Sequence, residues 1–368
     1  MRSTRIGVAA VAALALFLAG CSTAEDTNDD AGGVDVEAAQ AAIQPYLDAP
    51  SAFPVTEPLE TLPTGKRVAL LDCGSPVCGL FAAIAVAPAE ALGIELVRIE
   101  AGTTADGVAA AFDSVLEGGF DGVFVPALAP SLWERPLAEL SAAGIPVVTS
   151  GVTGVDTTAV AVAGASEPST ELSGRLMALW AIAQDGADTD VVFYVTPEIT
   201  FLNLLGEVFT ETVTEECPGC SVRVVDIPVA TFGSTAPQIV VDDLLAHPNT
   251  TAAVFGAGEQ AIGLPSALTT ADIEVKTLFN APDPAVLAGI QDGSYTAGFG
   301  LDLPVLTWTM VDSLARLMTD QEPAEAATND ELVRQFLTID NLEGDVSHGW
   351  TGYPDFADRF LALWADAN

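Results

Sequence analysis

Short hydrophobic runs alternate with longer amphipathic stretches along most of the chain, beginning near Lys66. The runs are rich in Val, Ile, Leu and Phe, which is typical of parallel strands that are buried on both faces. The longer stretches place apolar residues at helical spacing. The first set of predicted elements comprises strands at residues 68–71, 94–99, 122–125 and 146–149, with helices near 80–92, 106–116 and 132–143.

A second set of the same kind follows the first, so the pattern predicts the α/β class with two doubly wound parallel-sheet lobes. Two lobes also suit a chain of 368 residues, which is longer than one hydrophobic core usually serves. Open parallel sheets bind ligands at the carboxyl ends of their strands, so we expect the loops of both lobes to line an interlobe cleft. The second set of predicted strands covers residues 159–162, 191–195, 222–227, 252–255 and 275–278.

The N-terminus has the pattern of a lipoprotein signal peptide, residues 1–20. Two arginines precede the apolar run 6–18, which is short for a permanent membrane helix, and small residues lead to Cys21. This ending resembles the bacterial lipobox, which implies cleavage before Cys21 and a diacylglycerol anchor on that residue, usually with a further acyl chain. The alternative is an ordinary secretory signal in which Cys21 has no role. Residues 21–65 are predicted to form an acidic tether and a proline-rich lead-in.

Acidic residues dominate the charge of the chain. It has 51 Asp and Glu against 12 Lys and Arg, a formal net charge of −39. Such a chain repels phosphate backbones and anionic headgroups, which excludes nucleic acid as a partner and a basic patch as the membrane contact. The two histidines, His247 and His348, do not make an imidazole metal cluster or a catalytic triad. No metal or cofactor is therefore expected.

Five short segments occur in a characteristic order. They are GlyLysArgVal at 65–68, AspGlyValPheVal at 121–125, AlaGlyIleProValVal at 143–148, LeuLeuAlaHisProAsn at 244–249 and AlaValPheGly at 253–256. Each segment alone is generic, but their order and spacing resemble the type I periplasmic-binding-protein fold. Within that fold, the chain is similar to the solute-binding lipoproteins of carbohydrate ABC importers, over about residues 66–323.

The resemblance implies two lobes that are joined by a hinge with three crossings. We place the crossings near Val162, residues 298–301 and residues 318–323. The implied N-lobe covers residues 66–161 plus 299–322, and the implied C-lobe covers residues 162–298 plus 323–368.

The function that the resemblance implies is solute capture without catalysis. A lipid-anchored monomer on the extracytoplasmic face would bind a small organic solute, with a carbohydrate as the expected class, and deliver it to ABC permease subunits. A sensory lipoprotein that signals to a membrane receptor is one alternative. A nicotinamide-dependent oxidoreductase is another, because Gly256, Gly258 and Ala261 spell a GxGxxA motif after a strand. That fingerprint needs an acid after the next strand, where this chain has Asn280, so the glycines fit a binding loop better.

The predicted ligand residues lie in the loops after the strands. Aromatic rings cover the apolar face of a sugar, while carboxylates and amides bind its hydroxyl groups. Sugar binders of the family often have an aspartate where this chain has residues 127–129, and an arginine where it has 202–205. These departures count against a simple hexose or pentose and leave a less polar or aromatic-bearing solute as an alternative. The candidates are Ser75, Phe81, Trp133, Glu198, Asn203, Phe232, Glu259, Gln260, Asn280 and Asp302.

Four cysteines remain once Cys21 is assigned to lipid, and they form two close pairs. Outside the cytoplasm, we expect disulfides between Cys73 and Cys78 and between Cys217 and Cys220. Thiol chemistry is the alternative for the CysProGlyCys pair. Reactive pairs of that kind lie at a helix N-terminus, whereas this pair follows a predicted helix and precedes a strand, which favours a structural role.

Overall fold

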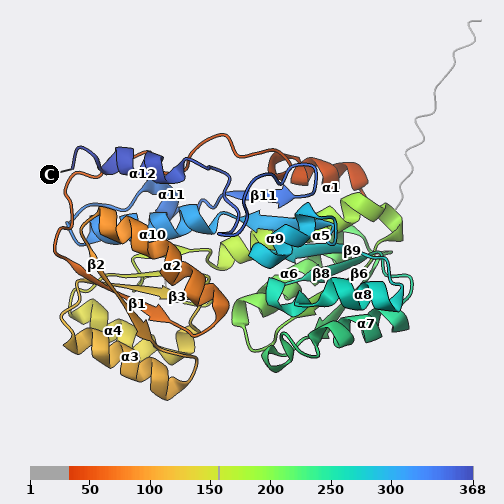
Figure 1. Cartoon of the computed structure of the whole chain (residues 1–368), viewed down its shortest axis with the longest axis horizontal. Helices are drawn as coiled ribbons and strands as arrows, with labels where there is room; N and C mark the ends of the chain where they lie inside the picture. The colour runs from red at the N-terminus through yellow and green to blue at the C-terminus, as the bar shows by residue number, and fades with distance from the viewer. Residues whose placement is uncertain (1–32, 156–157, 368) are drawn as a thin grey trace, which may run out of the picture. The chain divides into compact units, whose positions relative to one another are not determined.

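The computed structural model describes residues 33–155 and 158–367 (Figure 1). The predicted signal peptide and the lipidation site Cys21 lie outside the described residues. Within them, no helix combines the length and the apolar character that crossing a membrane requires. The chain forms two separate β-sheets, and helices cover both faces of each. This arrangement confirms the predicted α/β class.

The first sheet has the strand order β2-β1-β3-β4-β5, with all neighbours parallel. Successive side chains of a strand point to opposite faces, and both faces are buried. Leu70 and Phe124 pack in one core, while Leu71 and Val123 pack in another. This double burial explains the continuous apolar runs. The strands are β1 (Arg67–Asp72), β2 (Glu95–Glu100), β3 (Gly122–Pro126), β4 (Val147–Ser150) and β5 (Val162–Gly164).

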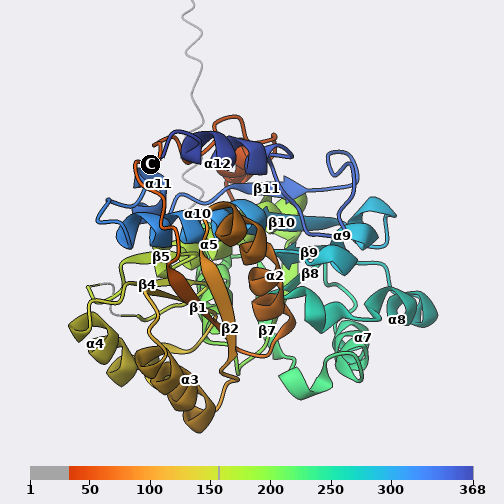
Figure 2. The same ribbon diagram turned by 60° about the vertical axis from the view of Figure 1, so that its left-hand side comes forward.

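Helices α2 and α10 cover one face of the first sheet, and α3 and α4 cover the other (Figure 2). The N-lobe is this sheet with its helices. Local sequence sets their starts: Ser75 caps α2, and Thr104 caps α3 through a side-chain oxygen that accepts a backbone N–H. The helices are α2 (Pro76–Ala91), α3 (Ala105–Glu117), α4 (Glu134–Ala142), α10 (Leu303–Leu317), α11 (Glu325–Thr328) and α12 (Phe356–Trp364).

The second sheet has the order β11-β10-β9-β8-β6-β7. Its strands run parallel except β11, which pairs antiparallel with β10. The strands are β6 (Asp190–Val195), β7 (Ser221–Asp226), β8 (Ala252–Phe255), β9 (Lys276–Asn280), β10 (Ala297–Leu301) and β11 (Arg334–Leu337).

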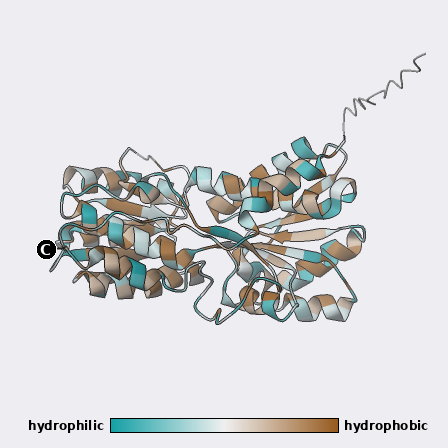
Figure 3. Ribbon diagram, turned by 90° about the horizontal axis from the view of Figure 1, so that it is seen from above, coloured by the Kyte–Doolittle hydropathy of each residue, from teal (hydrophilic) through white to brown (hydrophobic). Residues whose placement is uncertain are grey.

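The C-lobe is the second sheet with its helices. Helices α5 and α6 cover one face and carry α1, while α7, α8 and α9 cover the other. Figure 3 shows hydrophobic residues along the strands and mixed colouring on the helices, as amphipathic helices over buried sheets require. The helices are α1 (Val36–Ile43), α5 (Glu167–Asp185), α6 (Thr200–Glu216), α7 (Ala236–Ala246), α8 (Leu264–Ala271) and α9 (Pro284–Gln291).

Three connections of the expected kind link the two lobes. They are residues 165–166 between β5 and α5, Asp302 between β10 and α10, and residues 329–333 between α11 and β11. The third lies beyond the predicted position at 318–323, because that segment and α11 both stay with the N-lobe core.

The terminal segments add two further crossings beside these three. Residues 48–52 lead from α1 on the C-lobe to the N-lobe, and residues 351–352 lead from the C-lobe core to α12. The two segments hold each other: the Tyr353 hydroxyl donates to the carbonyl of Ala52, and the rings of Phe53 and Tyr353 meet edge to face at 5.2 Å. The connection between the lobes is therefore broader than the three predicted crossings.

The division into lobes differs from the prediction at three places. Strand β5 pairs with β4 and belongs to the N-lobe sheet, and β10 pairs with β9 and belongs to the C-lobe sheet. Helix α12 packs on the N-lobe, although residues 323–368 were expected in the C-lobe. The reason is its aromatic face: the Trp364 ring stacks on that of Trp308 in α10, with centroids 5.6 Å apart.

Candidate functional site

Loops at the carboxyl ends of the C-lobe strands are joined by side-chain hydrogen bonds. Gln260 Nε2 donates to Thr196 Oγ1 at 2.9 Å, which links the loops after β8 and β6. Asn280 Nδ2 donates to the carbonyl of Gly256 at 3.2 Å, which links the loops after β9 and β8. Three predicted binding loops are thus brought to one edge of the sheet.

Besides Glu259, four of the predicted ligand residues have accessible side chains at this edge. Glu198 is exposed, while Asn203, Phe232 and Asn280 are half-buried. Asn203 Nδ2 donates to the carbonyl of Pro197 at 3.1 Å, which orients its amide at the start of α6. A carboxylate, two amides and one aromatic ring are the groups that bind hydroxyls and cover the apolar face of a small polyol.

Gln260 and Glu259 have different roles in the loop after β8. Gln260 is fully buried, and its Oε1 accepts the N–H of Ala257 at 3.1 Å, so both ends of its amide are used within the protein. Glu259 is half-buried. Burial raises the pKa of the Glu259 carboxyl, and the carboxylate of Asp283 acts in the same direction. Glu259 is the candidate ligand group of this loop, and Gln260 supports it.

Ser75 lies at the carboxyl end of β1 in the N-lobe, where a disulfide fixes the loop. Its Oγ accepts the N–H of Cys78 at 3.5 Å and lies 3.0 Å from Cys73 Sγ. Cys73 and Cys78 are bonded, with Cα atoms 5.8 Å apart. A loop that is ordered before binding loses less entropy when a ligand arrives.

The second predicted disulfide, between Cys217 and Cys220, is also present. It lies between α6 and β7, at the amino end of that strand. The pair is therefore at the opposite edge of the sheet from the candidate loops, in keeping with a structural role.

The two N-lobe aromatic candidates, Phe81 and Trp133, are core residues. Trp133 is 1% exposed, stacks on Phe112 with centroids 5.9 Å apart, and donates its indole N–H to the carbonyl of Leu128 at 3.2 Å. Phe81 is 4% exposed and meets Phe124 edge to face. These contacts leave neither ring a face for a solute. The loop position of Trp133 suggested exposure, but a bulky ring there fills the space over α3.

Asp302 is a buried hinge residue rather than an open ligand group. It is 1% exposed and caps α10 by accepting the N–H of Val305 at 2.9 Å. Its other oxygen accepts the Thr351 hydroxyl at 2.9 Å and the Gly352 N–H at 2.8 Å. Asp302 thereby ties the β10–α10 crossing to the C-terminal crossing. Burial raises its pKa to about 6, although the three hydrogen bonds favour the charged form.

The raised pKa of Asp302 predicts a pH-dependent stability. Its folded pKa of about 6 exceeds the usual value of about 3.9 in an unfolded chain, so between these values the native state binds more protons. The stability that this residue contributes therefore falls as pH rises from about 4 to about 6, by about 2–3 kcal/mol. Urea unfolding at several pH values should show the wild type losing that much stability relative to Asp302→Asn. A difference that is constant over this range would contradict the prediction.

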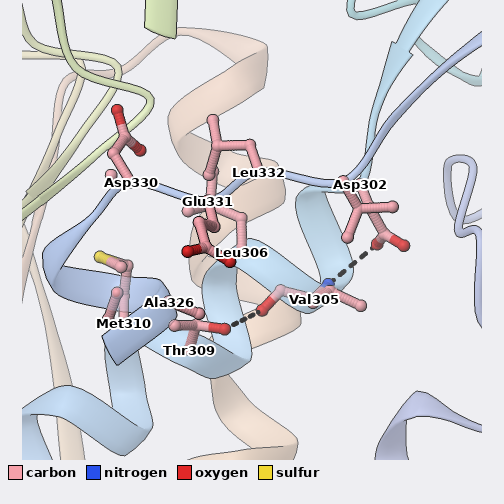
Figure 4. A pocket seen from close by; sticks show the side chains of 12 residues that line it. Asp302, Val305, Leu306, Thr309, Met310, Ala326, Asp330, Glu331 and Leu332 are labelled. Atoms are coloured by element: carbon pink, nitrogen blue, oxygen red, sulfur yellow. Dashed lines mark hydrogen bonds between the residues drawn. The ribbon is translucent and has the colours of Figure 1, made fainter. Parts of the chain in front are cut away.

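Asp330 is a second hinge carboxylate, which sequence patterns did not reveal. Its two oxygens accept the N–H of Ala165 at 2.8 Å and the N–H of Ser166 at 2.9 Å, and the Ser166 hydroxyl donates to it at 2.6 Å. These bonds tie the β5–α5 crossing to the α11–β11 crossing. Asp330 and Asp302 both border a hollow of only about 10 Å³ (Figure 4). In sequence, Asp330 looks like any polar turn residue.

A larger cavity of about 330 Å³ borders β5, the edge strand of the N-lobe sheet. Most of its lining is apolar, including Val152, Val155 and Val160, with Ser166 and Asp330 on its polar side. It does not include the candidate loops at the carboxyl ends of β6, β8 and β9.

Comparisons with known proteins place the chain in a family. A family model described as a periplasmic binding protein domain matches residues 79–322, about two thirds of the chain. The protein therefore belongs to the periplasmic binding protein domain family. Among curated proteins, no sequence matches it.

Solved structures of solute-binding proteins share the fold at low sequence identity. An ABC transporter solute binding protein from Agrobacterium vitis with bound allitol is 17% identical, with a TM-score of 0.64 over 75% of this chain and 96% of that one. A 5-methylthioribose transporter solute binding protein from Thermotoga lettingae is 17% identical, with a TM-score of 0.67 over 83% and 99%. A sugar ABC transport substrate-binding protein from Bordetella parapertussis is 18% identical, with a TM-score of 0.66 over 81% and 98%.

Proposed function

We propose that this protein is a lipid-anchored, extracytoplasmic receptor that captures a small polyhydroxylated solute, with sugars as the expected class, and delivers it to ABC permease subunits. The loops at the carboxyl edge of the C-lobe carry the proposal: those after β6, β8 and β9 are joined by hydrogen bonds and hold amides and carboxylates, and the loop after β7 holds an aromatic ring. The family supports it, as do the allitol and 5-methylthioribose of the similar structures.

The proposed site lies between the carboxyl edges of the two sheets. Closure of the lobes about the hinge would bring N-lobe groups onto a solute held by the C-lobe, and the ligand would favour the closed state through contacts made only there. The anchor in this proposal rests on the lipobox pattern that ends at Cys21. The residues proposed to contact the solute are Ser75, Glu198, Asn203, Phe232, Glu259 and Asn280.

The first test identifies the solute. Protein purified without denaturation is unfolded in acid, and the released small molecules are identified by mass spectrometry. We expect a polyol or sugar, and adding that compound back at about 100 times its dissociation constant should add about 2.7 kcal/mol to the stability. Release of a nicotinamide nucleotide would instead support the oxidoreductase alternative.

The second test concerns the site residues. Phe232→Ala and Asn280→Ala should each weaken binding of the released solute about tenfold or more, because one removes a stacking ring and the other a half-buried hydrogen-bonding amide. Asn249→Ala is the matched control. Asn249 is an exposed asparagine in the loop before β8, at the opposite edge of the same sheet. If all three variants bind the solute with the affinity of the wild type, the proposed site is wrong.

A further inference from the structure

The basic side chains of the described residues lie away from the proposed site, pair with acids, or, in one case, donate to serine oxygens. Residues 33–155 and 158–367 hold ten Lys and Arg side chains. Several lie at the amino ends of strands and pair there, such as Lys66 with Asp121 at 2.9 Å and Arg223 with Asp243 at 2.7 Å. Lys276 lies at the amino end of β9, and its ammonium likewise contacts the carboxylate of Asp185 at the end of α5.

Four more basic residues lie away from the carboxyl-end loops, three of them on helices and one at the start of a strand. Arg316 is buried in the last turn of α10, where it pairs with Asp312 at 2.7 Å. Arg359 pairs with Asp355 on α12 at 2.9 Å. Arg175 is exposed and lies eight residues into α5, about 12 Å from the start of that helix. Arg67, at the start of β1, pairs with an acid of β2.

Three basic residues lie nearer the carboxyl edges, and each is held by the protein itself. Arg98 contacts Asp72 at 2.7 Å and Glu100 at 3.0 Å, so two carboxylates bind one guanidinium. Arg135 pairs with Glu139 at 3.2 Å in the next turn of α4. The third, Arg334, is 8% exposed and donates to the backbone and hydroxyl oxygens of a serine in α5.

Carboxylates, by contrast, do reach the candidate loops. Glu198 and Glu259 stand in the loops after β6 and β8, and no basic side chain pairs with either among the described residues. Asp283 follows β9 and caps α9 by accepting the N–H groups of Ala285 and Val286 at 2.8 and 2.9 Å. The positive end of that helix is therefore already occupied by a charged side chain.

We propose that the solute site selects against anions and accepts neutral polyhydroxylated molecules and their cationic amine derivatives. This inference rests on the proposed function. An anionic group brought to these loops would lose its hydration and meet carboxylates, and residues 33–155 and 158–367 place no unpaired cation there to replace the water. A hydroxyl group would find acceptors, and an ammonium group would find opposite charge.

Matched ligands test the inference by isothermal titration of the purified protein. The probes are glucose, glucosamine, glucuronate and glucose 6-phosphate, then galactose, galactosamine and galacturonate, together with the solute released from the protein. Each anion should bind at least about 100-fold more weakly than its neutral parent. Raising the salt concentration should reduce this ratio of the two affinities, because salt screens the repulsion. The released solute should carry no net negative charge at neutral pH.

Charge-removing variants separate electrostatic rejection from steric rejection. The double variant Glu198→Gln, Glu259→Gln should reduce the discrimination against anions by about fivefold or more. Glu215→Gln is the matched control. Glu215 is exposed near the end of α6, about 22 Å along the helix from its start beside Glu198, and its replacement should leave the discrimination against anions unchanged.

Three outcomes would overturn the inference, and they differ in what they say of the proposed function. Tight binding or release of an anionic solute overturns the inference but leaves solute capture intact. If neither salt nor the double variant changes the discrimination against anions, the rejection of anions is steric. That result also overturns the inference. A protein that releases no solute and binds none of the probes rejects the proposed function, and the inference with it.

Discussion

Replacing Asp312 by alanine is expected to lower the free energy of unfolding of the N-lobe by about 3–5 kcal/mol. Asp312 is fully buried on α10, and its carboxylate accepts from Arg316 Nε at 2.7 Å and from the Trp364 indole N–H at 2.8 Å. Burial raises its pKa, and the neighbouring guanidinium opposes that change. Alanine would leave the buried arginine without its counter-charge and the indole N–H without its acceptor. Urea unfolding followed by tryptophan fluorescence measures the loss.

The chain offers an exposed pair of the same spacing as a control. Asp355 and Arg359 are also four residues apart, at 2.9 Å, but both side chains are largely in solvent. Asp355→Ala should therefore lower the free energy of unfolding far less than Asp312→Ala does, because an exposed ion pair contributes little. Equal effects of Asp312→Ala and Asp355→Ala would contradict the importance assigned to the buried pair and to its contact with α12.

Trp133→Ala should also destabilise the N-lobe strongly, by about 3–5 kcal/mol. The substitution removes a ring that is 1% exposed and stacked on Phe112, and it leaves a cavity between α3 and α4. Thermal or urea unfolding measures the loss. Because the ring faces the core, the affinity of the folded fraction for the solute should stay within about threefold of the wild type.

Phe232→Ala gives the opposite pattern. Its ring is half-buried in a loop, so truncation should cost less than half of the stability that Trp133→Ala costs, while the affinity for the solute falls.

A Trp133→Ala protein that is as stable as the wild type but does not bind the solute would contradict the core role of Trp133 and show that its ring belongs to the site.

The parallel strands were predictable from the sequence because burial on both faces leaves uninterrupted apolar runs. Predicted strands at 122–125 and 252–255 differ from β3 and β8 by at most one residue. Strand β10 was not recognised as a strand, because Gly298 and Gly300 interrupt its apolar pattern. Strand β11, with the sequence ArgGlnPheLeu, lacks alternation, and its pairing with β10 is determined by tertiary contacts alone.

The candidate site was only partly predictable. Residues that directly follow parallel strands lie at the carboxyl edge of the sheet, so the predicted strands were enough to place Glu198, Glu259 and Asn280 at one edge. Side-chain direction does not follow from position in a loop, so Trp133 was assigned to the site although it packs in the core. Asp330 was missed because its importance depends on hydrogen bonds to Ser166 and its neighbour, 164 and 165 residues away in sequence.

Solute capture itself is measured by titrating the purified protein with the compound it releases, using the wild type and the double variant Phe232→Ala, Asn280→Ala. We predict one binding site per chain in the wild type, no measurable binding in the double variant, and unchanged binding in Asn249→Ala. Wild-type affinity in the double variant would contradict a solute site at the carboxyl edge of the C-lobe.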